Sequence, residues 1–279
     1  GAPEWSADGE RYAISVITPD SVELWTGEAD KSGVRRIEGA KLNPFFGSEI
    51  QWMPDQKTLL VQTVPEAEGK APAAPTVPAG PDVKETAGGK ASSTYEVRDV
   101  LTSDHDEENL VYYGTTQLEL VDFATGRVSP IGRPGLHLGV SASPDGLLLV
   151  ETIHRPFSRV TTYDRFPREV EVWDRDGKLV KHVASVPLAE SVPIWGVPTG
   201  PREFQWRATA PATLCGIEAQ DGGDWNTSVP NRDRVKSWKA PFDGEAREVL
   251  RTEKRFGGFW WSEAPGVAFV TDYDAIKHW

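Results

Sequence analysis

The chain contains serines, histidines and carboxylates, the residue types of nucleophilic catalysis. A serine nucleophile on a strand-to-helix turn needs the pattern Gly-x-Ser-x-Gly, which projects its hydroxyl beside an oxyanion hole. The nearest approach here is Gly139-Val-Ser141-Ala-Ser143, which lacks the second glycine and leads into a β-turn. Ser141 and Ser143 are therefore interpreted as strand and turn residues, and no catalytic triad is expected. A serine, a histidine and a carboxylate in mutual contact would contradict this interpretation.

Basic residues cluster in one short part of this otherwise acidic chain, at Arg155, Arg159, Arg165 and Arg168. Because a guanidinium can bind a carboxylate through two parallel hydrogen bonds, the cluster could contact an acidic substrate. The alternative, which the sequence favours, is that these arginines pair on the surface with the nearby Asp164, Glu169 or Glu171.

A second candidate is the run Asp221-Gly-Gly-Asp224-Trp225. Its carboxylates, Asp221 and Asp224, could contact a substrate, and its two glycines would let the backbone approach a neighbour closely. A long hairpin turn is the simpler interpretation, and we favour it.

Neither a metal nor another cofactor is expected. The five histidines are scattered and none has the i, i+4 spacing of a helical zinc motif: His105, His137, His154, His182 and His278. The acidic run from Asp104 to Glu108 lacks the pattern of a calcium-binding loop and is predicted to be a solvated turn. Cys215 lies in an apolar run and is expected to be a core residue.

Composition limits the class of protein. The chain has 279 residues and a formal net charge of −12, which argues against nucleic acid or an anionic membrane as a partner. It begins at Gly1, so we expect a piece of a longer protein. Eleven Trp, 26 Gly and 22 Pro with a single Met favour a turn-rich β protein over a helical one.

The clearest structural unit runs from Leu136 to Val183. It reads as four strands, Leu136–Ala142, Leu147–Ile153, Arg168–Trp173 and Lys178–Val183, with the turn Ser-Pro-Asp-Gly between the first two. Four sequential antiparallel strands are one blade of a β-propeller. Similar turns recur along the chain and divide it into blades at roughly 1–40, 44–132, 135–184, 201–252 and a partial 256–279. An all-β propeller with about four to five blades is predicted, and a β-sandwich is the alternative.

Three insertions interrupt the blades. Residues 65–92 are rich in Pro, Ala and Gly and are expected to form a flexible or polyproline-like loop, followed by a short helix over Thr94–Leu101. The other two insertions are 154–167, which holds the arginine cluster, and 221–231, which begins with the Asp-Gly-Gly-Asp run.

Several short motifs, many of them in the insertions, resemble the prolyl oligopeptidase group of serine peptidases, in particular the branch that includes the plant chloroplast glutamyl endopeptidase. The resemblance runs from Trp5 to Trp261. Its motifs are Gly80-Pro81, Thr94-Tyr95, Leu101, Asp106-Glu107, Gln117-Leu118, Arg155–Ser158, Arg165–Arg168, Val172-Trp173, Pro187–Glu190, Pro193-Ile194, Trp206–Ala208, Pro211–Leu214 and, the most specific, Glu218–Asp224.

The resemblance implies an N-terminal propeller that selects peptides for an α/β-hydrolase domain, which these residues do not contain. The chain alone is then expected to be inactive, with peptide substrates and the hydrolase domain as its partners. The alternatives are a stand-alone propeller that binds a protein or peptide and, more distantly, a sugar hydrolase with facing carboxylates. Unpaired blade edges could also allow self-association. Related bacterial enzymes are often exported, so the resemblance favours an exported bacterial protein.

Overall fold

The computed structural model describes residues 1–47, 50–66, 69–76, 98–193, 196–262, 264 and 266–274. It divides into two compact units. The first comprises Gly1–Pro72, Glu108–Thr152 and Glu171–Lys181, and the second comprises Ala73–Glu107, Ile153–Val170 and His182–Trp279.

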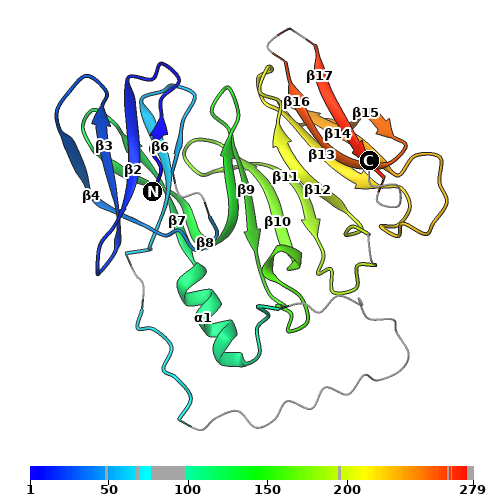
Figure 1. Cartoon of the computed structure of the whole chain (residues 1–279), viewed down its shortest axis with the longest axis horizontal. Helices are drawn as coiled ribbons and strands as arrows, with labels where there is room; N and C mark the ends of the chain where they lie inside the picture. Colours follow the sequence, from blue (N-terminus) through cyan, green and yellow to red (C-terminus); the bar gives the residue numbers. More distant parts are fainter. Residues whose placement is uncertain are drawn as a thin grey trace. The chain divides into compact units, whose positions relative to one another are not determined.

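Strands dominate both units (Figure 1). The first eight are β1 (Glu4–Trp5), β2 (Arg11–Ile17), β3 (Val22–Glu28), β4 (Val34–Leu42), β5 (Ile50–Trp52), β6 (Thr58–Thr63), β7 (Thr116–Asp122) and β8 (Val128–Ala142). The remainder are β9 (Leu148–Ile153), β10 (Arg168–Trp173), β11 (Leu179–Val186), β12 (Pro201–Trp206), β13 (Thr213–Ala219), β14 (Asp233–Lys239), β15 (Arg247–Thr252), β16 (Arg255–Trp261) and β17 (Ala268–Tyr273). β1 pairs with β2.

The strands form three sheets, and sequence neighbours are mostly sheet neighbours. The order is β1-β2-β3-β4-β6-β7-β8-β9-β10-β11 in the first, with β5 also paired to β6, then β12-β13-β14-β15, then β16-β17. Neighbouring pairs among β1–β8, β12–β15 and β16–β17 are antiparallel. The predicted all-β propeller fold is confirmed, as sheets whose strands follow one another in nearly sequential order.

The turn motif read from the sequence owes its shape to side-chain hydrogen bonds. The Ser143 hydroxyl donates to Asp145 Oδ1 at 2.7 Å and accepts from the Leu147 amide at 2.8 Å. Gly146 adopts φ +92°, a conformation that costs a side-chain-bearing residue about 1–2 kcal/mol. In the variant turn that ends at Gln56, the glutamine itself takes φ +53°.

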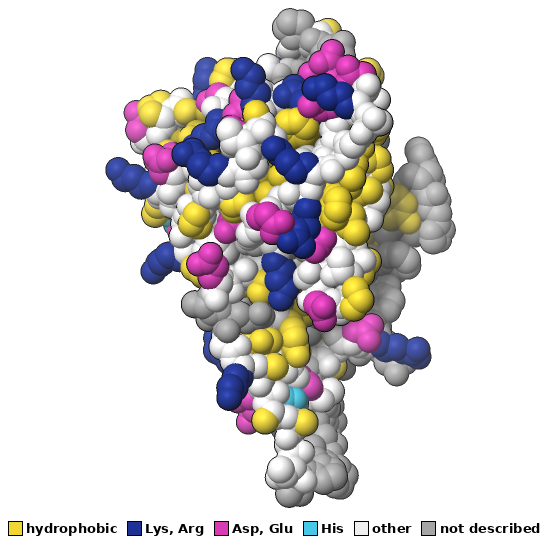
Figure 2. Space-filling model, turned by 90° about the vertical axis from the view of Figure 1, so that its left-hand side faces the viewer, with side chains coloured by type: hydrophobic (Ala, Val, Ile, Leu, Met, Phe, Trp, Pro, Cys, Tyr) yellow, Lys and Arg dark blue, Asp and Glu magenta, His cyan; other side chains and the backbone are white. Residues whose placement is uncertain are grey.

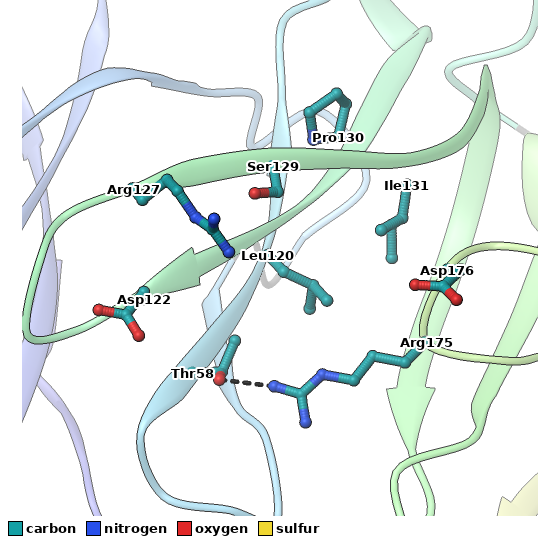
Figure 3. Close-up of a pocket in the computed structure, with 9 residues that line it drawn as sticks. All are labelled: Thr58, Leu120, Asp122, Arg127, Ser129, Pro130, Ile131, Arg175 and Asp176. Atoms are coloured by element: carbon teal, nitrogen blue, oxygen red, sulfur yellow. Dashed lines mark hydrogen bonds between the residues drawn. The ribbon is translucent and has the colours of Figure 1, made fainter.

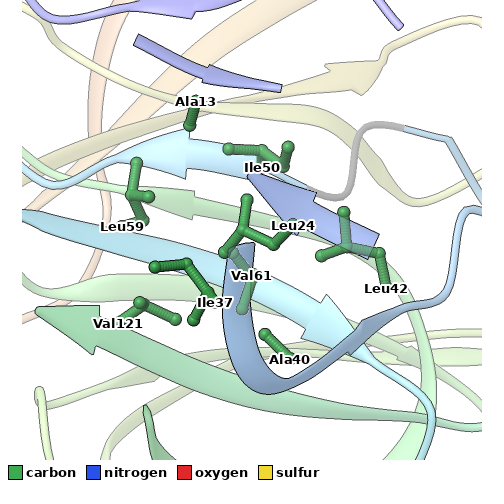
Figure 4. Packing of buried hydrophobic residues seen from close by; sticks show 9 residues of the cluster. All are labelled: Ala13, Leu24, Ile37, Ala40, Leu42, Ile50, Leu59, Val61 and Val121. Atoms are coloured by element: carbon green, nitrogen blue, oxygen red, sulfur yellow. The ribbon is translucent and has the colours of Figure 1, made fainter. Parts of the chain in front are cut away.

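β6 explains why an apolar run without alternation is still a strand. Leu59 and Val61 pack into one buried cluster with residues of β2–β4 (Figure 4). Leu60, on the opposite face, packs into another cluster with Leu118 and Leu148. Both faces of β6 are therefore buried, and each such side chain contributes roughly 1.5–3 kcal/mol by leaving water.

An α-helix, α1 (Asp104–Gly114), lies where the sequence analysis predicted a solvated turn, so that prediction is wrong. The acidic run predicted to be a solvated turn forms its first turn, where negative charge is favourable. Ser103 and Asp106 cap it reciprocally, since Asp106 Oδ2 accepts from the Ser103 amide at 3.0 Å and Ser103 Oγ accepts from the Asp106 amide at 3.2 Å. Of the helix expected over Thr94–Leu101, residues 94–97 lie outside the described residues and 98–101 are not helical.

Within the described residues, no helix is long and apolar enough to cross a membrane. On the face of the first unit where β3 and β4 lie, Lys and Arg are interspersed with Asp and Glu (Figure 2). This face shows no broad basic surface of the kind that binds nucleic acid.

Candidate functional site: a cluster of connecting loops

Three long connections in the second unit lie together, because the middle one contacts each of the other two. They join β9 to β10 (residues 154–167), β11 to β12 (187–200) and β13 to β14 (220–232). We call these three segments the loop cluster.

Hydrogen bonds join the family-like motifs inside the loop cluster. The Ala189 amide donates to the Arg165 carbonyl at 3.0 Å, and the Ser158 hydroxyl donates to Glu190 Oε1 at 2.7 Å. The Val197 amide donates to the Gly223 carbonyl at 3.0 Å. Motifs far apart in the sequence are thus brought into one place.

The Asp-Gly-Gly-Asp run lies against the 187–200 connection, and its second glycine is required there. A Cβ at Gly223 would lie 2.1 Å from the Val197 carbonyl oxygen, and one at Gly196 would lie 2.4 Å from the Gly223 carbonyl oxygen. Gly222 and Gly223 also have positive φ, +67° and +78°. The two backbones touch as closely as glycine allows.

A pocket of about 310 Å³ opens between these two segments. Its lining comes from residues 186–193, residues 197–199 and Gly222. Most of the lining residues are Val, Pro, Leu or Ala, and the exposed carboxylate of Glu190 is the charged group among them. Pockets of this size and character take small ligands or parts of peptides.

Two of the four predicted arginines are neutralised by α1. Arg155 forms an ion pair with Glu107 and lies 4.7 Å above the Phe157 ring, and Arg159 pairs with Asp104. These carboxylates are not the expected ones. Glu169 instead contacts two histidines, and Glu171 accepts a hydrogen bond from Trp173 Nε1 at 2.9 Å.

The other two arginines lie at the end of the 154–167 connection. Arg168 donates to the Asp164 carbonyl oxygen at 3.2 Å. Arg165 is half-buried, and within the described residues its guanidinium has neither an ion pair nor a hydrogen bond. Arg165 is therefore the member of the cluster that remains available to a carboxylate.

Asp221 is held in a buried ionic network that the sequence did not indicate. Its Oδ2 accepts from Arg232 at 2.8 Å and from Arg255 at 2.6 Å, and its Oδ1 accepts from the Gly223 amide at 3.0 Å. Asp233 completes the network by accepting from Arg255 and Arg202, each at 2.9 Å. These bonds tie the motif to β12, β14 and β16.

The two acidic candidates of the motif therefore differ in exposure. The Asp221 side chain has no exposed area, so reaching a substrate would require breaking buried ion pairs, a change that costs about 3–5 kcal/mol. Asp224 is half-buried, and its Oδ1 accepts from the amide and the side chain of Asn226 at 2.9 and 3.1 Å.

A serine, a histidine and a carboxylate do meet in the second unit, at Ser185, His182 and Glu169. However, Ser185 Oγ lies 3.2 Å from His182 Nε2 and Glu169 Oε2 lies 2.5 Å from the same nitrogen. In a catalytic triad the acid binds the other ring nitrogen and the serine gives its proton to the histidine. Here the Ser185 hydroxyl donates to Glu169 at 2.7 Å, so the contact lacks the geometry of a nucleophile and its base.

The remaining candidates are structural. Ser141 lies in β8, and Ser143 is a buried turn residue. Cys215 is buried in β13, where burial raises its thiol pKa to about 11, so a reactive thiolate is disfavoured. Among the described residues, no group of three or more His, Cys, Asp or Glu side chains could hold a metal ion.

Comparison with known proteins gives close relatives in sequence. The chain is 34% identical over 98% of its length to a "Probable glutamyl endopeptidase, chloroplastic" from Oryza sativa subsp. japonica, and 35% identical over 93% of its length to one from Arabidopsis thaliana. It spans only 30% and 28% of these relatives. Both are plant proteins, so the bacterial source expected from the sequence is not supported. No protein-family model matches the chain.

A solved structure supports the fold. The acylaminoacyl peptidase of Pyrococcus horikoshii superposes with a TM-score of 0.50 at 14% identity, over 93% of this chain and 33% of that one. At this identity the likeness concerns the fold alone. Over nearly its whole length, the chain is homologous to a part of the glutamyl endopeptidases.

Proposed function

We propose that this chain is a non-catalytic β-propeller that gates and selects peptide substrates for the α/β-hydrolase domain of a longer serine peptidase. The observation that carries the proposal is the 34% identity that covers 98% of this chain but 30% of a glutamyl endopeptidase. The proposal is supported by the hydrogen bonds that Arg165, Glu190 and Gly223 each make to another segment of the loop cluster, because these bonds bring the family-like motifs together.

Within this function, Arg165 is the residue we propose for contact with an acidic substrate. The relatives of the chain are named for glutamyl endopeptidase activity, which calls for recognition of a carboxylate. A half-buried guanidinium without an ion pair can supply that recognition, and a charge-assisted bond is worth roughly 1.5–3 kcal/mol. Arg155 and Arg159 are less suitable because α1 already supplies their carboxylates.

The first arm of the test concerns the isolated chain. It should not hydrolyse fluorogenic peptides that contain Glu, because the described residues hold no aligned nucleophile and base. A longer protein that contains this sequence and a hydrolase domain should hydrolyse them. Peptidase activity from the isolated chain would overturn the proposal, and peptide binding with no effect on any peptidase would favour a stand-alone binding propeller.

The second arm uses Arg165→Gln in the longer protein. The ratio of kcat/KM for a Glu peptide to that for the matched Gln peptide should fall about tenfold, as expected for loss of about 1.4 kcal/mol. Arg247→Gln, in the exposed part of β15, is the matched control and should leave the ratio unchanged. An unchanged ratio in Arg165→Gln would exclude this role while leaving the gating function untouched.

A further inference from the structure

A second pocket lies in the first unit, outside the loop cluster. Its volume is about 440 Å³, within the range of small-molecule sites. It is lined by the start of β6, β7, the first residues of β8 and the turn between β10 and β11 (Figure 3).

The walls of this pocket are fixed by close packing and by one arginine. A Cβ at Gly177, in the β10–β11 turn, would lie 2.2 Å from the Gly132 amide nitrogen, so the turn lies directly on β8. From the same turn, Arg175 reaches across to β6 and donates at 2.6 Å to both Asp55 Oδ2 and Thr58 Oγ1. Arg175 is therefore part of the wall.

Two charged side chains of the lining, Arg127 and Asp176, have neither an ion pair nor a hydrogen bond to another described residue. Figure 3 shows them on opposite sides, with Leu120 and Ile131 between them. The other lining carboxylate, Asp122, is engaged by Thr125, whose amide and hydroxyl both donate to its Oδ1 at 2.7 Å. These bonds lower the pKa of Asp122, and the nearby positive charge of Arg127 lowers it further, although no ion pair or hydrogen bond joins the two side chains.

We propose that this pocket binds a small zwitterion whose ammonium and carboxylate flank an apolar body, as in a free amino acid or a dipeptide with an aliphatic side chain. Arg127 binds the carboxylate, Asp176 binds the ammonium, and Leu120 and Ile131 contact the apolar part. A ligand with one charge would leave the opposite group of the pocket without a partner. Both charged groups are exposed, so we expect an affinity on the order of 1 mM.

The test is a titration of the whole chain, followed by NMR or calorimetry, with leucine and leucyl-leucine as the zwitterions. Acetyl-leucine lacks the ammonium, leucinamide lacks the carboxylate, and acetyl-leucinamide lacks both. We expect the zwitterions to bind at least about fivefold more tightly than any capped compound, since each exposed charge contact is worth up to about 1 kcal/mol. Whichever of leucine and leucyl-leucine binds more tightly shows whether the ligand is a free amino acid or a peptide.

Variants assign the contacts. Arg127→Gln should remove the advantage of leucine over leucinamide, and Asp176→Asn should remove its advantage over acetyl-leucine. Arg247→Gln, on β15 in the other unit, should bind like the unmodified chain. The proposal is overturned if capped and uncapped compounds bind equally, if neither variant changes the preference, or if leucine and leucyl-leucine do not bind up to about 20 mM, well above the expected affinity.

Discussion

At the scale of single residues, His137 is a buried histidine that serves the fold. Its ring nitrogens lie 3.1 Å from Thr152 Oγ1 and 3.2 Å from the Arg133 carbonyl oxygen, and its ring meets Trp173 edge to face at 5.9 Å. Burial disfavours the charged imidazolium and lowers the pKa of His137 to about 4.

This shift predicts acid sensitivity. With a folded-state pKa of about 4 and an unfolded value near 6.5, the unfolded chain binds the proton more readily. The associated stability is present above about pH 6.5 and falls as the pH drops toward 4, by up to roughly 3 kcal/mol. The midpoint of thermal unfolding, measured from pH 7.5 to 4.5, should fall less steeply in His137→Gln than in the unmodified chain. If the midpoint falls equally steeply in both chains, His137 is excluded as the cause of the loss of stability in acid.

The limits of prediction from sequence are also visible at this scale. Arg165 and Asp221 were identified as candidates from a cluster of basic residues and from the Asp-Gly-Gly-Asp run, but their environments were not predictable. Asp221 is bonded to Arg255, 34 positions away, and nothing local in the sequence indicates that pairing. Likewise, the fact that Arg155 pairs with Glu107, 48 positions away, depends on how the chain folds.

At the scale of elements, prediction succeeded where local chemistry decides the structure. The turn at Ser143 is specified by its own side chains, and β6 by a short apolar run. α1 was missed because only Leu110 and Gly114 of the helix are buried, which leaves almost no apolar periodicity. Its one clear signal was the Ser103 and Asp106 capping pair.

The Asp-Gly-Gly-Asp turn allows a matched comparison of two adjacent glycines. Both have positive φ, but only at Gly223 would a Cβ meet backbone, whereas at Gly222 nothing lies within 4 Å. Gly223→Ala should therefore destabilise the chain by about 1–3 kcal/mol more than Gly222→Ala, the cost typical of overpacking. Urea unfolding of both variants measures the difference. Equal losses of stability in the two variants would mean that the positive φ alone, and not the contact with Val197, explains why glycine is needed at both positions.

At the scale of the whole molecule, the recurrence of one turn motif in the sequence predicted that groups of antiparallel strands repeat along the chain. The sheets nevertheless contain unequal numbers of strands. The last sheet has two described strands, and the sheet before it has four. Among the described residues β17 is consequently an edge strand, and Phe269 on it and its cross-strand partner Trp260 are 66% and 59% exposed. Such an edge favours pairing with another chain.

We therefore expect concentration-dependent self-association through β17, measured by sedimentation velocity. Phe269→Lys should shift the equilibrium toward the monomer, because charge on an edge strand opposes pairing. Ile17→Lys is the control, since Ile17 is 79% exposed but lies in β2, in the first unit and not in the sheet of β17. Equal effects of the two variants, or a chain that is monomeric at every concentration, would contradict a specific role of β17.

β8 runs without a break for 15 residues, and it serves as a neighbour to both β7 and β9. The same backbone thus closes one group of strands and opens the next, with no loop between them to act as a hinge. We expect the two groups to unfold together, because melting either one would remove partners from a strand that the other also uses. This part of the protein should accordingly open to solvent in one cooperative step, with the amides of β7, β8 and β9 exchanging their hydrogens together.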